Sequence, residues 1–370
     1  MAAPPPPRRA RVLITGFMDW RNLGMDDPHA TWKSDENPSG RLLVGAACGA
    51  PPLARDGPLP RLLRARAGVL GVDFSFTCLP TLWRAAWGLD YGFFDVVVHL
   101  GLGVYGENYT TLLVESGAVN LRCPAADAAG HKPPALTLDG ALDRFSSAEL
   151  GVLGGGEGGD NSGGTGKDAT VLLPTAHQAA ALERAFSSAA PGHPSGVADG
   201  SALPGGFVLE VAGARAENSY ICNETHWRGL DAAHLSAAAR QAAVASEAAA
   251  AVAAAVEAEE AVEVAVERAG SPGGLRGTGG GGGTGNSTTD AGTGGGGCED
   301  GTHALRAAFF VHLPYPDPAL GDAGYGPLAA AVAAAVERLV TAALVTTPQG
   351  QGGRGAVAVR PAAQTYYSGN

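Results

Sequence analysis

Residues 94–101 read FDVVVHLG, a run that is apolar almost throughout. Strands covered on both faces show such continuous runs, whereas half-exposed strands alternate apolar and polar residues. Four further runs share this character and predict four more buried strands. They are RVLITGF (11–17), VDFSFTCLP (72–80), FVLEVAG (207–213) and AFFVHLP (308–314).

Helix-like stretches lie between these runs, at residues 37–48, 174–190 and 326–344. Strands that alternate with helices along a chain are typical of α/β proteins. The sequence therefore predicts a three-layer α/β/α sandwich around a central, mostly parallel sheet.

Low-complexity segments interrupt this alternation. Glycine supplies 56 of the 370 residues and clusters in 151–167 and 269–300, which predicts flexible inserts there. The stretch 235–267 is almost pure Ala, Val and Glu, so it favours a helix but offers little to pack against. We expect an exposed helix there, continued by a disordered loop, and neither a coiled coil nor a membrane anchor.

The expected domain organisation follows from these segments. A single domain is predicted over residues 10–345, with a Gly-rich insert at 151–167 and an Ala/Gly-rich insert at 235–300. Residues 346–370 are predicted to form a flexible tail.

The charge balance argues against nucleic acid as a partner. The formal net charge is −11, and the 25 Lys and Arg residues are spread without any basic run, whereas phosphate binding needs a concentrated basic face. The N-terminal sequence contains no secretory h-region, and no uncharged apolar stretch of membrane length occurs outside the Ala-rich region. We expect a cytoplasmic protein without membrane contacts.

The five cysteines form an odd set without a CxxC pair, which predicts neither a disulfide framework nor a zinc site. We expect no metal and no cofactor. Cys48, Cys78 and Cys123 are expected to be core hydrophobes, and Cys298 an exposed thiol in a loop.

The segment 101–106, GLGVYG, fits the GxGxxG pattern and follows a predicted strand. A dinucleotide site needs a helix to begin at the last glycines, because the helix N-terminus holds the pyrophosphate. The continuation ENYTTLLVESGAVN is instead rich in β-branched residues. A dinucleotide-binding oxidoreductase is therefore only a distant alternative.

Nucleophilic catalysis by cysteine is the stronger possibility. Cys222 lies in ICNETHW (221–227), at an expected helix start, where the helix dipole and free N–H groups favour a thiolate. His312 ends a predicted strand, and Glu115 is a lone acid in an apolar stretch, so the two could form a relay with the thiol. Taken singly, each residue is as readily a buried cysteine, a core histidine or a surface acid.

Several motifs, all in the same order, resemble those of the pyroglutamyl-peptidase I family of cysteine peptidases. The matching segments are RVLITGF and ENPS near the N-terminus, CLPT (78–81), DVVVHLGLG leading to VESGAVN, RCPAADAAGHKP (122–133), LLPT (172–175), SYICN (219–223) and FFVHLPY (309–315). The resemblance implies the family's pyrrolidone carboxyl peptidase-like fold and its omega-peptidase activity.

By this resemblance Cys222 attacks the amide bond after an N-terminal pyroglutamyl residue and forms a thioester. His312 acts as base and then acid, and Glu115 orients its ring. N-terminally pyroglutamylated peptides would be the substrates, and a homo-oligomer is an open option. Five residues are implied to bind substrate: Phe17 and Trp20 as a clamp on the lactam ring, Tyr220 and Ile221 in the same pocket, and Arg122 beside the thiol as an aid to the oxyanion.

Four departures from the family pattern keep two alternatives open. Leu102 or Tyr105 stands near the family's glutamine, and Glu217-Asn218 replaces an Ala-Gly pair. The second aromatic is Trp20 in a longer loop, and Cys222 and His312 are 90 residues apart. The same fold could serve an altered substrate, or it could be a catalytically inactive binding protein.

Overall fold

The computed structural model describes most of the chain outside the low-complexity segments. The described residues are 8–18, 37–44, 57–104, 109–138, 142–152, 170–187, 202–214, 220–269, 305–317 and 319–345, with the backbone alone at Val104, Asp143 and 260–269. The chain divides into two compact units, residues 1–237 with 303–370 and residues 238–302.

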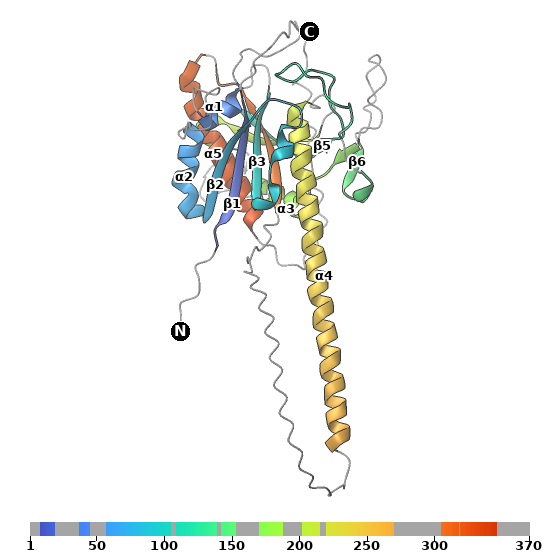
Figure 1. Cartoon of the computed structure of the whole chain (residues 1–370). Helices are drawn as coiled ribbons and strands as arrows, with labels where there is room; N and C mark the ends of the chain where they lie inside the picture. Colours follow the sequence, from blue (N-terminus) through green and yellow to red (C-terminus); the bar gives the residue numbers. More distant parts are fainter. Residues whose placement is uncertain are drawn as a thin grey trace, which may run out of the picture. The chain divides into compact units, whose positions relative to one another are not determined.

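The first unit has a mixed α/β fold around a six-stranded, mostly parallel sheet (Figure 1). In spatial order the strands are β2 (Val72–Leu79), β1 (Ala10–Phe17), β3 (Val96–Val104), β9 (Ala307–Pro314), β4 (Thr111–Glu115) and β8 (Val208–Ala212). The first four strands are parallel to one another, and β4 and β8 form a parallel pair that joins antiparallel to β9.

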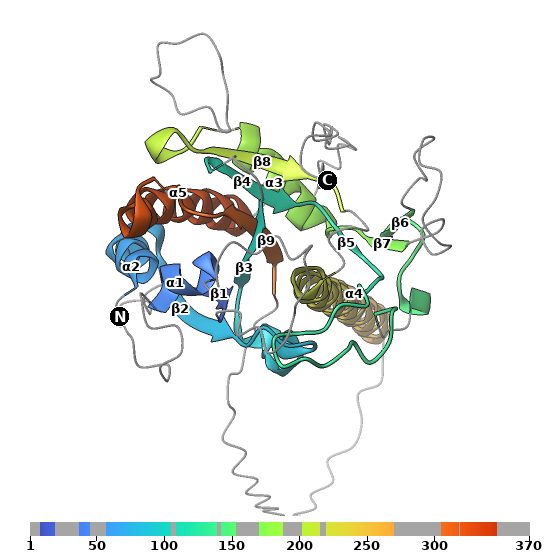
Figure 2. The ribbon, with the colours of Figure 1, turned by 90° about the horizontal axis from the view of Figure 1, so that it is seen from above.

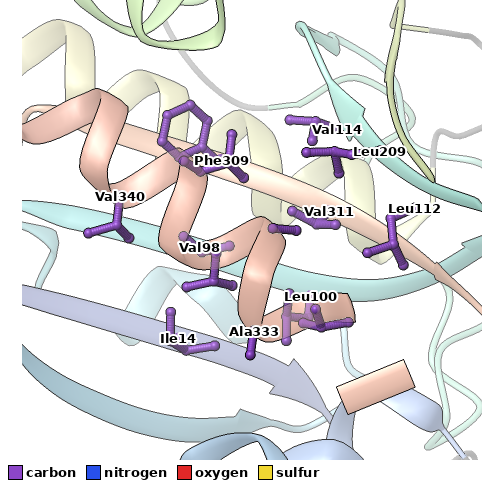
Figure 3. Close-up of a cluster of buried hydrophobic side chains, with 14 of the residues drawn as sticks. Ile14, Val98, Leu100, Leu112, Val114, Leu209, Phe309, Val311, Ala333 and Val340 are labelled. Atoms are coloured by element: carbon purple, nitrogen blue, oxygen red, sulfur yellow. The ribbon is translucent and has the colours of Figure 1, made fainter. Parts of the chain in front are cut away.

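One face of the sheet carries the main hydrophobic core. Side chains alternate between the two faces of a strand, and on this face they are large and apolar, as with Val98, Leu100 and Val311, which are fully buried (Figure 3). Four helices contribute to this core: α1 (Pro38–Val44), α2 (Pro58–Leu70), α3 (Ala176–Ser187) and α5 (Tyr325–Leu344).

Helix α2 shows how local sequence sets an element's ends. Pro58 stands at its first turn, where the missing N–H has no helical partner to lose, and Gly71 ends it in the left-handed region at φ 66°. This helix was not among those predicted from the sequence, although Pro58 and Gly71 both mark its ends.

Helix α5 lies in the core. The span Gly321–Leu344 is long and apolar enough to cross a membrane by length and composition, but 61% of its most apolar window is buried inside the protein. A core helix of a soluble protein passes the same test, so this span is weak evidence for a membrane.

The other face of the sheet carries different side chains and is covered by the first turns of α4 (Ile221–Ala269) (Figure 2). Ala233 of α4 packs on Leu13, Val97 and Ala308 of three neighbouring strands. Further along, the side chains of residues 241–259 are exposed, which confirms the predicted exposed helix.

A second, three-stranded antiparallel sheet packs on the same part of α4. Its strands are β5 (Ala118–Val119), β7 (Thr170–Leu172) and β6 (Leu150–Val152). Trp227 and Leu230 of α4 lie in one buried cluster with Ala118 and Leu172. Short 3-10 turns complete the fold at Ala85–Gly88, Tyr91–Phe93, Leu142–Arg144, Pro204–Gly206 and Gly321–Gly324.

The α/β architecture and all five predicted strands are confirmed, as β1, β2, β3, β8 and β9. The tail 346–370, most of the insert 151–167 and all but the first residue of the predicted loop 269–300 lie outside the described residues. The prediction of a single domain interrupted by inserts stays a prediction.

Candidate active site

The segment ICNETHW begins α4, and nearly all of its side chains are buried. Ile221 packs into the apolar cluster beneath the helix. Asn223 accepts a hydrogen bond from the Val119 backbone N–H at 2.8 Å and donates to the carbonyls of Val119 and Leu121. The asparagine therefore joins the start of α4 to β5, and this fixes where Cys222 stands.

Glu224 makes a second anchor in the same turn. Its carboxylate accepts two hydrogen bonds from Arg122, the shorter at 2.6 Å, and others from the Arg84 backbone and the Trp87 indole. The side chains of Arg122 and Glu224 are almost fully buried, so a charge left without its partner there would be costly. Arg122 also donates to the carbonyl of Thr137 at 2.7 Å. These contacts give Arg122 a structural role, and its implied action on an oxyanion stays a prediction.

Glu115 and His312 are brought together by the antiparallel pairing of β4 with β9. His312 lies opposite Leu113, so Glu115, two residues on, presents its side chain on the same face. The His312 Nε2 lies 2.6 Å from a carboxylate oxygen of Glu115, with both side chains buried. The two residues that the sequence predicted to form a relay are therefore in contact, and their catalytic role stays a prediction.

The pKa of Glu115 reflects this setting. Burial by itself raises the pKa of the carboxyl, but the charge of His312 and the hydrogen bonds from His226 and His312 outweigh burial and hold the pKa well below its usual range. Glu115 is therefore an anion, and an anionic carboxylate only accepts hydrogen bonds. His312 therefore donates from Nε2, and its buried Nδ1 has no hydrogen-bond partner among the described residues.

Two glycines of β3 make room for the site. A Cβ at Gly101 would lie 2.9 Å from Cys222 Sγ and 2.6 Å from the Phe310 ring, and a Cβ at Gly103 would overlap Nδ1 of His312. Both glycines are inside β3, and no helix begins among the residues described between Gly101 and Glu115. Gly101 and Gly103 thus serve close packing within a strand, and the helix start that a dinucleotide site needs does not occur in the described part of this region, which argues against the dinucleotide alternative.

The Cys222 thiol lies on this same face but is not a preformed thiolate. Its Sγ donates to the carbonyl of Leu102 at 3.9 Å, and Nδ1 of His312 has no hydrogen-bond partner among the described residues. Burial, and then the negative charge of Glu115, raise the pKa of the thiol. The prediction that the helix start favours a thiolate is therefore wrong for this resting arrangement, since those two effects outweigh the dipole.

A solved structure is similar to this chain. Pyroglutamyl peptidase I from Bacillus amyloliquefaciens shares 12% sequence identity, with a TM-score of 0.37 over 88% of this chain and 97% of that one. No family model matches the chain, and a comparison with curated proteins finds no match. At this score the likeness carries no information on activity.

The residues implied to bind substrate are only partly grouped by the structure. Phe17 and Ile221 lie in one buried cluster with Phe310, against which Tyr220 and Cys222 pack. Trp20 lies outside the described residues.

Phe17 is held by the ENPS segment. Ser39 accepts a hydrogen bond from the Phe17 backbone N–H at 3.0 Å, and Asn37 accepts from the Ser39 hydroxyl at 2.7 Å.

Trp83 is an aromatic residue of this cluster that the sequence analysis did not single out. Its ring meets Tyr220 edge-on at 5.2 Å, and its buried indole N–H has no partner among the described residues. Trp83 follows two residues after the CLPT motif (78–81), and this position was the only signal in the sequence that could have indicated it.

Two buried histidines were also missed. His226 lies one helical turn after Cys222, and its Nδ1 is 3.1 Å from the second carboxylate oxygen of Glu115. His99 of β3 is hydrogen bonded to Thr15 at 2.8 Å and to Tyr91 at 3.3 Å. The i, i+4 spacing from the cysteine is the signal that could have found His226.

The described residues contain no group of three or more His, Cys, Asp or Glu side chains suited to a metal ion. Cys78, Cys123 and Cys222 are each partly buried. Cys48 and Cys298 lie outside the described residues.

Proposed function

We propose that the chain is a cysteine hydrolase that removes N-terminal pyroglutamyl residues from peptides, with Cys222 as nucleophile. One observation carries the proposal: the Glu115–His312 hydrogen bond of 2.6 Å lies on the same sheet face as the Cys222 thiol. A base oriented by a carboxylate, with its free nitrogen on the side of a thiol, is the arrangement of a nucleophilic relay.

The chemistry proceeds in two halves. Nδ1 of His312 takes the thiol proton as Sγ bonds to the scissile carbonyl carbon, and the carbonyl π electrons move to oxygen. Collapse of this adduct expels the amine, which takes the proton back from His312 and leaves a thioester. Water then attacks the thioester, gives its proton to His312 and releases pyroglutamate as the thiol reforms.

The first turn of α4 is suited to the oxyanion. The first N–H groups of a helix have no partner within it, and they point along the positive end of the dipole. Cys222 is the second residue of α4, so a carbonyl bonded to its sulfur lies beside these donors. Such donors stabilise the charge that develops on oxygen in the transition state.

The ring of the substrate would lie on the aromatic cluster around Phe17. A pyroglutamyl ring presents two apolar faces, one lactam N–H and one lactam C=O. Phe17 and Trp83 are aromatic residues of the cluster against which Cys222 packs, and the unpartnered indole N–H of Trp83 is a donor that fits a lactam C=O.

An inactive binding protein is the second candidate, and one observation favours it. The thiol contacts the Leu102 carbonyl, its pKa is raised, and no hydrogen bond joins it to His312. In that case the relay would be present but unused.

Hydrolysis of a fluorogenic pyroglutamyl amide separates the two. We expect turnover by the wild-type chain, complete loss in Cys222→Ala and His312→Ala, and a loss of roughly 10³- to 10⁴-fold in Glu115→Gln. Cys123→Ser is the matched control for Cys222→Ala and should stay active. Iodoacetamide should abolish the activity of both the wild type and Cys123→Ser, because both keep Cys222. No turnover by folded wild-type protein, or full turnover by Cys222→Ala, would overturn the proposal.

A further inference from the structure

Glu115 serves two histidines, and the proposed relay uses only one of them. One carboxylate oxygen accepts from Nε2 of His312 at 2.6 Å, and the other accepts from Nδ1 of His226 at 3.1 Å. The side chain of His226 is fully buried, and that of Glu115 is 2% exposed. The carboxylate is therefore hydrogen bonded to β9 through His312 and to α4 through His226.

The hydrogen-bond arrangement fixes the proton on His226. Because Glu115 is an anion and only accepts, Nδ1 of His226 carries a proton. Its Nε2 is buried without a partner among the described residues. His226 is thus tied to Glu115 through Nδ1 alone among the described residues.

The position of His226 in α4 ties the nucleophile to the relay. Cys222 and His226 are four residues apart, so they lie on the same face of the helix, one turn from each other. The helix that carries the sulfur thereby also holds the carboxylate of β4. The Phe310 ring contacts both histidines: its centroid lies 5.9 Å from that of His226 and 4.9 Å from that of His312.

We propose that His226 is a positioning residue of the relay: it holds the second oxygen of Glu115, so that the first stays directed at His312 while Cys222 on the same helix stays in register. This rests on the proposed function for its consequence in turnover. A carboxylate that has lost one of its two histidine partners can rotate away from the base, and misplacement by about 1 Å costs roughly 100-fold in rate.

Neighbouring titratable groups define the setting of the test. Around Glu115 these are His312 on β9 and His226 and Cys222 on α4, and His99 on β3 lies close enough to His226 to interact electrostatically with it. Without the His226 hydrogen bond the carboxylate can turn from His312, and in that orientation it stabilises the protonated His312 ring less. The thiolate–imidazolium pair should then form only at higher pH.

The experiment compares His226→Asn with His226→Leu, because the Asn amide can place a donor where Nδ1 lies and Leu cannot. We expect His226→Leu to lower kcat roughly 10- to 100-fold with KM within about twofold, and His226→Asn to stay within about threefold of wild type. His99→Asn is the matched control, since His99 also meets the Phe310 ring but has no contact with Glu115 in the structure.

A second readout needs no substrate. The rate of iodoacetamide labelling at Cys222, followed by peptide mass spectrometry against pH, should shift to higher pH in His226→Leu and stay unshifted in His226→Asn and His99→Asn. If the chain has no peptidase activity, this profile still tests His226. Should His226→Leu fail to fold, His226→Gln, whose amide extends beyond the Nδ1 position, takes its place. An unshifted profile, or equal losses in the Asn and Leu variants, would overturn the proposal.

Discussion

The two faces of the central sheet are built from the same strands but differ in character. On β3, Val98 and Leu100 belong to the apolar core, while His99, Gly101 and Gly103 alternate with them on the face under α4. The first face is filled by apolar side chains (Figure 3), and the second holds buried histidines and a carboxylate. Stability and candidate chemistry are thus separated by one residue along one strand.

The difference shows what each face demands of its neighbours. The apolar face needs only matching volume, which α5 supplies with Val332, Val336 and Leu339. On the polar face a buried polar group without a partner costs about 1–3 kcal/mol, so most such groups have one, although Nε2 of His226 and Nδ1 of His312 have none among the described residues. This is why Glu115 has two histidines and His99 has Thr15 and Tyr91.

The strongest test breaks the polar face. In Gly103→Ala the new Cβ overlaps the His312 ring, so the base must move, and we expect kcat/KM on a pyroglutamyl amide to fall at least about 10³-fold, or ~4 kcal/mol. Gly68→Ala is the matched control, since a Cβ there meets nothing within 4 Å and should stabilise α2 by about 0.5–1 kcal/mol. Normal activity in Gly103→Ala would mean that His312 does not lie over this glycine.

The next test breaks the apolar face on the same strand. Leu100 is fully buried, so Leu100→Ala should lower the free energy of unfolding by about 3 kcal/mol, measured by urea titration. The relay does not contact this side chain on the opposite face, so the pH profile of Cys222 labelling should keep its midpoint. A shifted midpoint would show that the two faces are coupled.

A smaller effect sharpens the comparison through pH. Burial, and then the charge of His226, lower the pKa of His99 to about 3. Between pH 6.5 and pH 3 the unfolded chain therefore binds a proton at His99 that the folded chain does not, and stability falls as the pH drops. From pH 7.5 to pH 5 this group alone contributes a loss of about 2 kcal/mol.

His99→Asn removes that proton while keeping a side-chain partner for Thr15. The variant should be less stable than wild type at pH 7.5 but should lose about 2 kcal/mol less between pH 7.5 and pH 5, by urea unfolding at both pH values. Equal pH dependence in the two proteins would contradict a neutral, buried His99.

The smallest effect is expected away from both faces. The side chains of residues 241–259 are exposed, so replacing 241–300 with a short Gly/Ser linker removes little apolar surface from a core. Thermal unfolding and peptidase turnover should stay close to wild type, within about 0.5 kcal/mol. Loss of soluble protein after this deletion would show that the segment packs on the rest of the chain.

The sequence predicted the strands of the apolar core well. Runs such as VVVHL and AFFVHL are long and apolar enough to be strands wherever they pack. It did not predict β4, because five residues between a glycine-rich segment and Gly117 offer no clear period. Nor could it show that β4 runs antiparallel to β9, which depends on tertiary pairing over 197 residues, the separation of Glu115 from His312.

The candidate site was predictable only where a motif carried it. Glu115 and His312 were proposed from their positions in the sequence and given roles by the resemblance, and the structure places them in contact. His226 belongs to no motif quoted for the family, and its role depends on which strand lies beneath α4. The raised pKa of Cys222 was likewise out of reach, since burial and a neighbouring carboxylate are properties of the folded chain.

The position of β9 affects how the chain folds during synthesis. This strand, Ala307–Pro314, lies between β3 and β4, two strands that the ribosome completes about 200 residues earlier. Until residue 314 emerges, a nascent chain carries two half-sheets, each with an open hydrogen-bonding edge. The strand that closes this gap also delivers His312, so a chain released early lacks its base and exposes the edges most prone to aggregation.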